Sequence, residues 1–508
     1  MKRDNIILLK VSGVLRLVGL AVFLWTLSPV SRADTSPPVA VGAALNAAGI
    51  SADNVSIVVQ GVDDAVPVIF HNASRAMNPA SVMKLVTSYA ALDLLGPAFV
   101  WKTTVLSDAP IVDGVLSGNL YFRGSGDPRL ALEQFWLLLR QLRSRGLKEI
   151  RGNIVLDRGA YATAPHNPAS FDHKPLRTYN VGPNALLVNF QSLTLTLHYD
   201  EEEEGVRVFV ETPYHDLAID NRLKAVRGVC GDWREKFKVS AKGSQVTLDG
   251  NYPASCGDKL LFLAPWQANE QFMRLFRALW QELGGKWRGA MRVGTPPADA
   301  KQIAVHLSPP LSDVLNDLNK YSNNVMARQV FLTLSPRPAT TSGAVQRVRE
   351  WLGRKKIEMP TLVIENGSGL SRNERVSADE LRRLLLDVWK SPVMPELVSS
   401  LPVAGVDGTL RRRLRDSPAY GRAHLKTGSL EGVRSVAGYV LDARGKRWVL
   451  VCIINDPRSG AGGPVIDALV EWVAERAGDA LAAPTQNAPS GGETNGVGGN
   501  APAPGAAL

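Results

Sequence analysis

The sequence predicts an α/β fold in which an antiparallel sheet carries helices on both faces and is interrupted by a large β-rich insertion. Three observations support this prediction. Apolar strand patterns occur near both ends of the chain, helical patterns accompany them, and a block of short strands lies between them. The 508 residues, 45% hydrophobic and 21% charged, can form two or three domains.

Residues 1–33 have the pattern of a signal peptide. Basic residues precede an apolar run at 17–27, and small residues offer a cleavage site after Ala33. The run is too short to span a bilayer comfortably, and an uncleaved anchor is the alternative. We therefore expect export to the periplasm, with membrane association at most peripheral.

The charge of the chain limits its partners. The formal net charge is +10, and the predicted leader holds five basic residues and one acid, so the mature chain carries +6. This is mildly basic and without lysine blocks. We expect no nucleic-acid partner for such an exported protein, and an anionic envelope surface is the looser alternative.

The three cysteines fit an oxidising compartment. Cys230 and Cys256 are flanked by turn residues, so we expect them to form a disulfide. Cys452 lies in the apolar stretch "WVLVCIIND" and is expected to be a free thiol in a buried strand. No group of residues has metal-ligand spacing, and we expect neither a metal nor another cofactor.

The segment 34–100 begins the predicted main domain. Two apolar strands, at 54–62 and 65–72, surround an Asp-Asp turn. A helix should follow over 78–96, with Pro79 in its first turn and Gly96 at its end.

The segment 101–305 is predicted to be inserted and to form two subdomains. Asp127 is the expected cap of a helix over 128–146, and a second helix is expected over 269–285. The acidic run 201–204 should be a solvated hairpin tip. Short strands are predicted at 118–124, 151–161, 192–200, 205–212 and 244–252.

The segment 306–480 returns to an α/β pattern. Three strands are predicted at 422–428, 433–442 and 447–456, the last two as an antiparallel hairpin. The tail 481–508 is rich in Ala, Pro, Gly, Ser and Asn and is expected to be disordered. Helices are predicted at 311–319, 323–334, 343–353, 378–389 and 464–478.

Ser81 and Lys84 are spaced to lie on one face of the helix predicted over 78–96. A serine hydroxyl needs a neighbour to take its proton before it can attack a carbonyl. A lysine can do this only when it is neutral, which requires burial or a second cation nearby. A single S-x-x-K occurs by chance in a chain of this length, and the alternative is a solvated lysine near a helix start.

Two later motifs favour the catalytic interpretation. Ser322 and Asn324 form an S-x-N, and Lys426 to Gly428 form a K-T-G. S-x-x-K, S-D-N and K-T-G occur together in serine enzymes that react with penicillin. Here the three motifs follow that order and fall at a predicted helix start, an interhelical loop and a strand. Alone, "SNN" could be a helix cap and "KTG" a strand end.

With these motifs the chain resembles the low-molecular-mass class C penicillin-binding proteins, the D-alanyl-D-alanine carboxypeptidase/endopeptidase family. The separation of 241 residues from Ser81 to Ser322 leaves room for the large insertion of that family. The resemblance extends over nearly all of the mature chain except the tail. It implies a penicillin-binding transpeptidase-like, or β-lactamase-like, domain. Further similar stretches are "GSGDPRL" at 124–130, "GNIVLDRGAY" at 152–161, "GSGLSR" at 367–372 and "AGVDGTLRRRL" at 404–414.

The resemblance also implies an activity: a serine D,D-peptidase that hydrolyses D-Ala-D-Ala termini or D-alanyl cross-links of peptidoglycan and is inhibited by β-lactams. Ser81 would be the nucleophile, Lys84 its base, and Ser322 the relay of a proton to the leaving amine. Lys426 would be the second cation that Lys84 requires.

The same resemblance implies the residues that hold the substrate. Asn324 would bind the substrate amide, and Thr427 the terminal carboxylate. Gly428 would allow close approach to the strand. The N–H groups of Ser81 and Ser429 would form an oxyanion hole.

Some residues depart from the family pattern. Ser429 stands where threonine is frequent, and Glu365-Asn366 precede "GSGLSR" where an aspartate is common. In relatives that cut diaminopimelate-containing peptides, an arginine and an acid hold the free end of that side chain. Arg372 matches the arginine, and Asp172 is the candidate acid.

Two other functions remain alternatives at this point. One is a β-lactamase or esterase on the same scaffold, which would need rapid deacylation. The other is a non-catalytic peptidoglycan-binding protein, which the intact Ser81, Lys84, Ser322 and Lys426 argue against.

Overall fold

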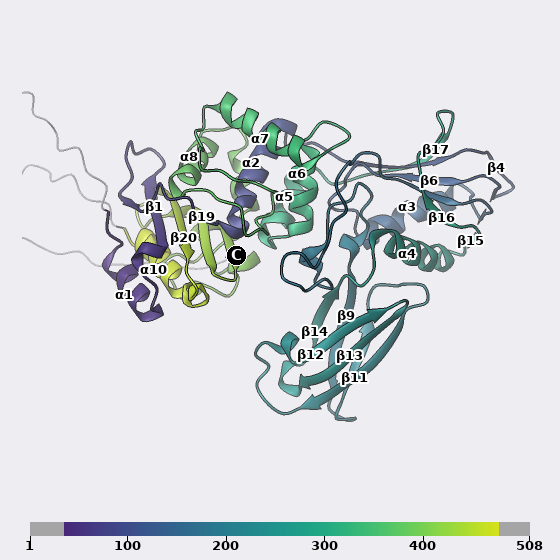
Figure 1. Ribbon diagram of the computed structural model, residues 1–508, viewed down its shortest axis with the longest axis horizontal. Coiled ribbons are helices and arrows are strands. Elements are labelled where there is room, and N and C mark those ends of the chain that lie inside the picture. Colours follow the sequence, from purple (N-terminus) through teal and green to yellow (C-terminus); the bar gives the residue numbers. More distant parts are fainter. Residues whose placement is uncertain (1–34, 477–508) are drawn as a thin grey trace, which may run out of the picture.

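The computed structural model describes residues 35–476 (Figure 1). The predicted signal peptide, 1–33, and the predicted disordered tail, 481–508, lie outside the described residues. Within 35–476, no helix is long and apolar enough to cross a membrane.

The central sheet joins segments from the two ends of the chain. Its strand order is β18-β19-β20-β1-β2, and every neighbouring pair is antiparallel. Ile57 of β1 lies opposite Cys452 of β20, 395 residues later. The antiparallel sheet of the sequence prediction is confirmed. The strands are β1 (Val55–Gly61), β2 (Ile69–His71), β18 (Ala423–Leu430), β19 (Val433–Leu441) and β20 (Arg447–Asn455).

Helices cover both faces of this sheet, as predicted (Figure 1). Successive strand residues point to opposite faces, so Val58 joins one core while Ile57 joins the other. α1 (Val39–Ala48) and α10 (Gly463–Ala474) pack on one face. α1 was not predicted. The other face carries α2 (Lys84–Leu95), α5 (Leu311–Lys320), α6 (Asn324–Thr333), α7 (Thr341–Lys355), α8 (Ala378–Trp389) and α9 (Met394–Ser400).

The intervening region, residues 101–305, has a hydrophobic core of its own. The chain leaves the main domain through β3 (Lys102–Ser107) and returns to it through β17 (Lys301–Leu307). These two strands pair with each other. They belong to a five-stranded sheet, β16-β8-β6-β3-β17, and a four-stranded sheet, β15-β7-β5-β4, lies in the same region. The remaining strands of these sheets are β4 (Ile111–Val112), β5 (Val115–Leu116), β6 (Leu120–Arg123), β7 (Glu149–Ile150), β8 (Ile154–Asp157), β15 (Lys286–Trp287) and β16 (Met291–Val293).

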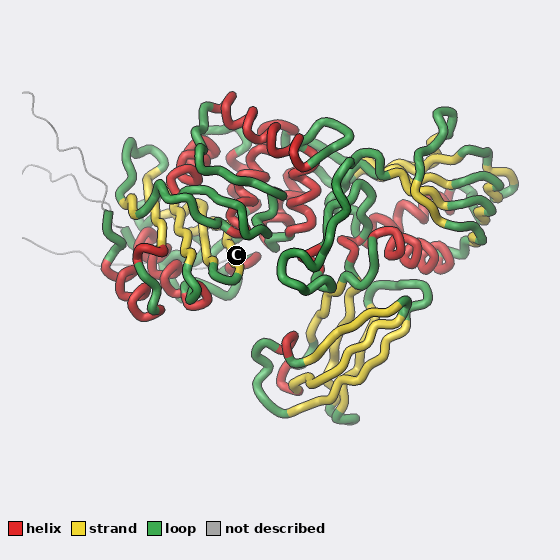
Figure 2. Tube along the Cα trace, viewed as in Figure 1, coloured by secondary structure: helices red, strands yellow, loops and turns green. Residues whose placement is uncertain are grey.

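Two three-stranded sheets complete the region (Figure 2). The strands are β9 (Leu193–Asp200), β10 (Gly205–Val210), β11 (Ala218–Val226), β12 (Phe237–Lys242), β13 (Gln245–Pro253) and β14 (Lys259–Leu263). The acidic run 201–204 is the exposed turn between β9 and β10, as expected. The disulfide between Cys230 and Cys256 is present, and Cys452 is a buried free thiol.

One helix boundary in the intervening region was predicted wrongly. The helices there are α3 (Leu132–Ser144) and α4 (Ala268–Glu282). Asp127 does not cap α3, because the helix begins after Ala131. The Asp127 carboxylate instead accepts the N–H of Arg129 at 2.8 Å, in a turn that ends before the helix starts.

Candidate active site

Ser81 lies in a short 3₁₀ turn, Ala80–Met83, that runs directly into α2. The sequence predicted one helix from residue 78, so the α-helix begins later than expected, at Lys84. Ala80 has φ +46°, a conformation that non-glycine residues rarely adopt. Such strain persists only where the surroundings impose it, and it is frequent at functional sites.

Two strands and a loop hold this turn. Asn455 of β20 accepts the Asn78 N–H at 2.8 Å, and the Ser435 hydroxyl of β19 donates to the Pro79 carbonyl at 2.6 Å. The loop residue Gly369 also packs against the turn. A Cβ at Gly369 would lie only 2.0 Å from the Ala80 carbonyl oxygen. The Ser81 backbone is therefore fixed from several directions.

The Lys84 side chain is fully buried and has three hydrogen-bond partners. Its Nζ lies 2.9 Å from the Ser81 hydroxyl and 2.7 Å from Asn324 Oδ1, and it also contacts the Ser368 carbonyl. Two of these partners can only accept hydrogen bonds, whereas a hydroxyl can also donate. A neutral amine would give its two hydrogens to the amide and carbonyl oxygens and direct its lone pair at the Ser81 hydroxyl.

The surroundings of Lys84 favour the neutral amine. Burial lowers its pKa well below the ordinary value, and the nearby charge of Lys426 lowers it further. Glu374 opposes this shift, and Arg328 adds to it. Neither Glu374 nor Arg328 was singled out from the sequence, because nothing in their local pattern signals that they are buried beside Lys84.

Ser322 and Lys426 form a second serine–lysine pair. Lys426 Nζ donates to the Ser322 hydroxyl and to the Thr427 carbonyl, both at 2.8 Å. Burial lowers the pKa of Lys426 to about 7. Ser322 has φ +55° in the turn between α5 and α6, where Asn323 caps α6 by accepting the N–H groups of Val325 and Met326. The "SNN" stretch therefore contains a helix cap as well as a side chain that contacts Lys84.

The K-T-G segment lies on β18, packed against the turn that carries Ser81. A Cβ at Gly428 would lie 2.2 Å from Ser435 Oγ and 2.7 Å from the Pro79 carbonyl oxygen, so a side chain would push β18 away from Ser81. The Thr427 hydroxyl lies 2.7 Å from the Thr409 hydroxyl. Thr409 was not expected at this position and lies within the stretch 404–414.

A pocket of about 600 Å³ opens at Ser81. Ser81, Asp172 and Arg372 all line this pocket. Among the contacts within residues 35–476, none joins the Asp172 carboxylate to the Arg372 guanidinium. The Arg372 guanidinium lies 4.9 Å from the centre of the Phe171 ring and donates to the Glu431 carbonyl at 2.7 Å. The predicted site residues that line the pocket are Ser81, Asp172, Ser322, Asn324, Arg372 and Ser429.

Asp172 is held as a carboxylate within this wall. It accepts hydrogen bonds from the Tyr179 hydroxyl at 2.6 Å and from Asn180 Nδ2 at 2.7 Å. Burial alone would raise the pKa of Asp172, but these hydrogen bonds outweigh it and the pKa is lowered. A negative and a positive group therefore line the same pocket as the serine.

Comparison with known proteins relates the whole described chain to one family. Residues 39–476 match the model of the D-Ala-D-Ala carboxypeptidase 3 (S13) family. The D-alanyl-D-alanine carboxypeptidase DacB of Haemophilus influenzae is 26% identical over 435 residues, which cover 80% of this chain and 86% of that protein. The D-alanyl-D-alanine carboxypeptidase of Actinomadura sp. strain R39 is 29% identical over 422 residues, covering 79% and 77%.

Solved structures show the same fold. The crystal structure of penicillin binding protein 4 from Haemophilus influenzae superposes with a TM-score of 0.70 at 24% identity, covering 83% of this chain and 96% of that one. The complex of that protein with a β-lactam gives a TM-score of 0.68 at 23% identity, covering 86% and 100%. The penicillin-binding, β-lactamase-like fold predicted from the sequence is confirmed.

Proposed function

This chain belongs to the D-Ala-D-Ala carboxypeptidase 3 (S13) family and is a D,D-peptidase acting on peptidoglycan, and we propose that Ser81 is its nucleophile. The observation that carries the proposal is the environment of Lys84. A buried amine 2.9 Å from the Ser81 hydroxyl, with its other two partners fixed, is placed to take the serine proton.

The proposed reaction begins when Ser81 Oγ attacks the carbonyl of the penultimate D-alanine. The proton of the hydroxyl passes to Lys84 Nζ, and the backbone N–H groups of Ser81 and Ser429 receive the developing oxyanion. Ser322, hydrogen-bonded to Lys426, relays the proton from Lys84 to the departing amine, so that Lys84 is neutral again. Water then hydrolyses the ester on Ser81 and regenerates the free enzyme.

The remaining residues would bind the substrate. The Thr427 hydroxyl, beside that of Thr409, would take the terminal carboxylate of D-Ala-D-Ala. Asn324 would hold the substrate amide while it also orients Lys84. β-Lactams would acylate Ser81 at the same place and leave slowly.

We also propose where the protein acts. A peptidoglycan-acting member of this family works on the cell wall, outside the cytoplasm. The basic and apolar segments at 1–33 support export to the periplasm through a cleaved leader.

The function is tested with purified muropeptides and the chain from residue 34. Pentapeptides ending in D-Ala-D-Ala should lose one D-alanine, cross-linked dimers should be tested for cleavage in parallel, and prior treatment with penicillin should abolish the activity. Binding of muropeptides with neither release of D-alanine nor cleavage of cross-linked dimers would contradict the proposal. Mass spectrometry of the products distinguishes carboxypeptidase from endopeptidase cleavage.

Arg372 gives a test of substrate specificity. Replacing Arg372 by alanine is expected to raise KM about tenfold for stem peptides that carry diaminopimelate, because one charged hydrogen bond to the side chain is lost. Acylation by penicillin, which lacks that side chain, should change little.

Arg383→Ala is the matched control for Arg372→Ala, because Arg383 pairs with Asp379 on α8 and does not line the pocket. KM is measured for peptides with diaminopimelate and for peptides with alanine in its place. An equal rise in KM for both peptides would show that Arg372 does not bind the diaminopimelate side chain.

A further inference from the structure

Glu374 is a fully buried carboxyl group that the proposed mechanism leaves without a role. Its Oε1 accepts the backbone N–H groups of Glu365 and Asn366, at 3.0 and 3.2 Å. Within residues 35–476, its Oε2 is buried and has no hydrogen-bond partner. A buried carboxylate oxygen without a partner costs free energy, so its retention needs a reason.

A series of hydrogen bonds links Glu374 to Lys84. Asn366, held by Glu374, accepts the Ser368 N–H at 2.9 Å and the Ser368 hydroxyl at 2.6 Å. The Ser368 carbonyl in turn contacts Lys84 Nζ. One turn along α2, the Thr87 hydroxyl donates to the Gly367 carbonyl at 2.7 Å. The loop 365–369 is thus fixed between Glu374 and the helix that bears Lys84.

The charged groups around this loop come from different parts of the chain. Lys84 lies on α2, Arg328 on α6 and Lys426 on β18, while Glu365 lies in the loop and Glu374 in the segment between the loop and α8. Burial raises the pKa of Glu374 to about 7; Glu365 raises it too, and Lys84 lowers it. Glu374 partly offsets the lowering of the Arg328 pKa by burial. Glu374 is therefore a fully buried acid near three buried basic residues.

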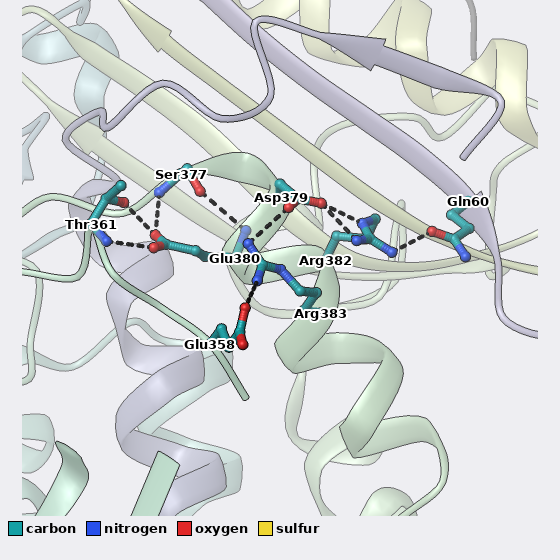
Figure 3. A network of polar contacts seen from close by, with 8 residues as sticks. All are labelled: Gln60, Glu358, Thr361, Ser377, Asp379, Glu380, Arg382 and Arg383. Atoms are coloured by element: carbon teal, nitrogen blue, oxygen red, sulfur yellow. Dashed lines mark hydrogen bonds and ion pairs between the residues drawn. The ribbon is translucent and has the colours of Figure 1, made fainter. Parts of the chain in front are cut away.

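A second buried glutamate shows what a purely structural role looks like (Figure 3). Glu380, at the start of α8, accepts the Thr361 N–H at 2.6 Å with one oxygen. Its other oxygen accepts the Ser377 N–H at 2.8 Å and the Thr361 hydroxyl. Both oxygens of Glu380 are used. At Glu374, a neutral amide would hold the loop equally well, so hydrogen bonding alone does not explain the carboxyl group.

We propose that Glu374 is a positioning residue whose charge acts on Lys84 across the loop 365–369 and so sets the pH at which Lys84 becomes the amine that activates Ser81. The inference rests on the proposed role of Lys84 as base. When Glu374 is ionised, it stabilises the Lys84 ammonium. When Lys84 has lost its proton, its lone pair faces the Ser81 hydroxyl. After Lys84 accepts the serine proton, the Glu374 carboxylate, which is ionised throughout this step, stabilises the ammonium that forms.

The sign of the expected effect follows from this arrangement. Glutamine at position 374 keeps the hydrogen bonds to the loop and removes the negative charge. Lys84 should then lose its proton at lower pH, because an opposite charge raises the pKa of a lysine. The acid limb of the pH profile for acylation of Ser81 should move down by about one pH unit. The plateau should fall because the ammonium formed in the reaction loses its counter-charge.

The experiment measures the second-order rate constant of acylation by fluorescent penicillin across about pH 5 to 9 for wild type and Glu374→Gln. Glu374→Asp, which keeps the charge, should return the acid limb toward the wild-type position. Glu380→Gln is the matched control and should lower the melting temperature without moving the limb. An unmoved limb in Glu374→Gln would overturn the inference while leaving the proposed function intact. Failure of the wild type to acylate would instead overturn the proposed function.

A measurement on the wild type covers the case in which Glu374→Gln does not fold. The infrared carbonyl stretch of a protonated carboxylic acid should be present on the acid side of neutrality and disappear with a midpoint at about pH 7. Most other carboxyl groups are already ionised there. Persistence of the band at pH values where the acylation rate has reached its plateau would overturn the inference, because Glu374 would then carry no charge to act on Lys84.

Discussion

Replacing Ser81 by alanine is expected to abolish covalent labelling of the protein by penicillin and to lower D-alanine release by at least about 10⁴-fold. The Ser81 hydroxyl oxygen is the atom that would form the bond to the acyl group. Within residues 35–476, no other hydroxyl contacts the Lys84 amine. The substitution removes one half-buried oxygen and leaves the 3₁₀ turn held by Asn455 and Ser435, so the fold should be unchanged.

Intact mass after penicillin treatment measures this result directly. Ser88→Ala is the matched control, because Ser88 is buried on the same helix, where it accepts from Asn319 Nδ2 at 3.1 Å and does not line the pocket. One adduct on wild type and on Ser88→Ala, but none on Ser81→Ala, is the expected pattern. No adduct on folded wild type would favour the non-catalytic binding protein, and rapid loss of the adduct with β-lactam turnover would favour a β-lactamase.

Replacing Lys84 by methionine is expected to slow acylation of Ser81 by about 10²- to 10⁴-fold, the usual contribution of a general base. Methionine fills much of the same buried space but cannot accept a proton. Arginine at position 84 should not restore the rate, because a guanidinium stays protonated at every pH of interest.

Lys355→Met is the matched control for Lys84→Met, because it removes a lysine that the proposed mechanism does not use. Lys355, on α7, pairs with Asp387 at 2.9 Å and with Asp93 of α2 at 3.5 Å, and it does not line the pocket. Its replacement should reduce stability and leave the acylation rate near that of wild type. Stopped-flow acylation rates and melting temperatures of both variants are compared. If Lys84→Met acylates nearly as fast as wild type, another group is the base.

Local patterns predicted several elements well. The helix expected at 378–389 is α8, with the same bounds. The hairpin expected from 433–442 and 447–456 is β19 and β20. In these segments the hydrophobic period matches the face that the fold buries. At Asp127 the prediction was wrong because another local structure competes with the cap: its carboxylate accepts the Arg129 N–H in a turn, and the helix begins only after Ala131.

The start of α2 was predicted wrongly for a different reason, a tertiary one. Residues 78–83 resemble an ordinary helix start, but hydrogen bonds from β19 and β20 hold Asn78 and Pro79 in another conformation. These partners are more than 350 residues away in sequence. No local propensity carries that information.

By itself, the sequence determined the class of chemistry, because three motifs in a fixed order predict a serine nucleophile, a lysine base and a strand beside them. Only the tertiary structure decided the surroundings of these groups. Lys84 meets Asn324 from 240 residues away and lies near the charges of Lys426 and Glu374. The ionisation of Lys84 depends on burial and on nearby charges, and both arise only when distant segments pack together.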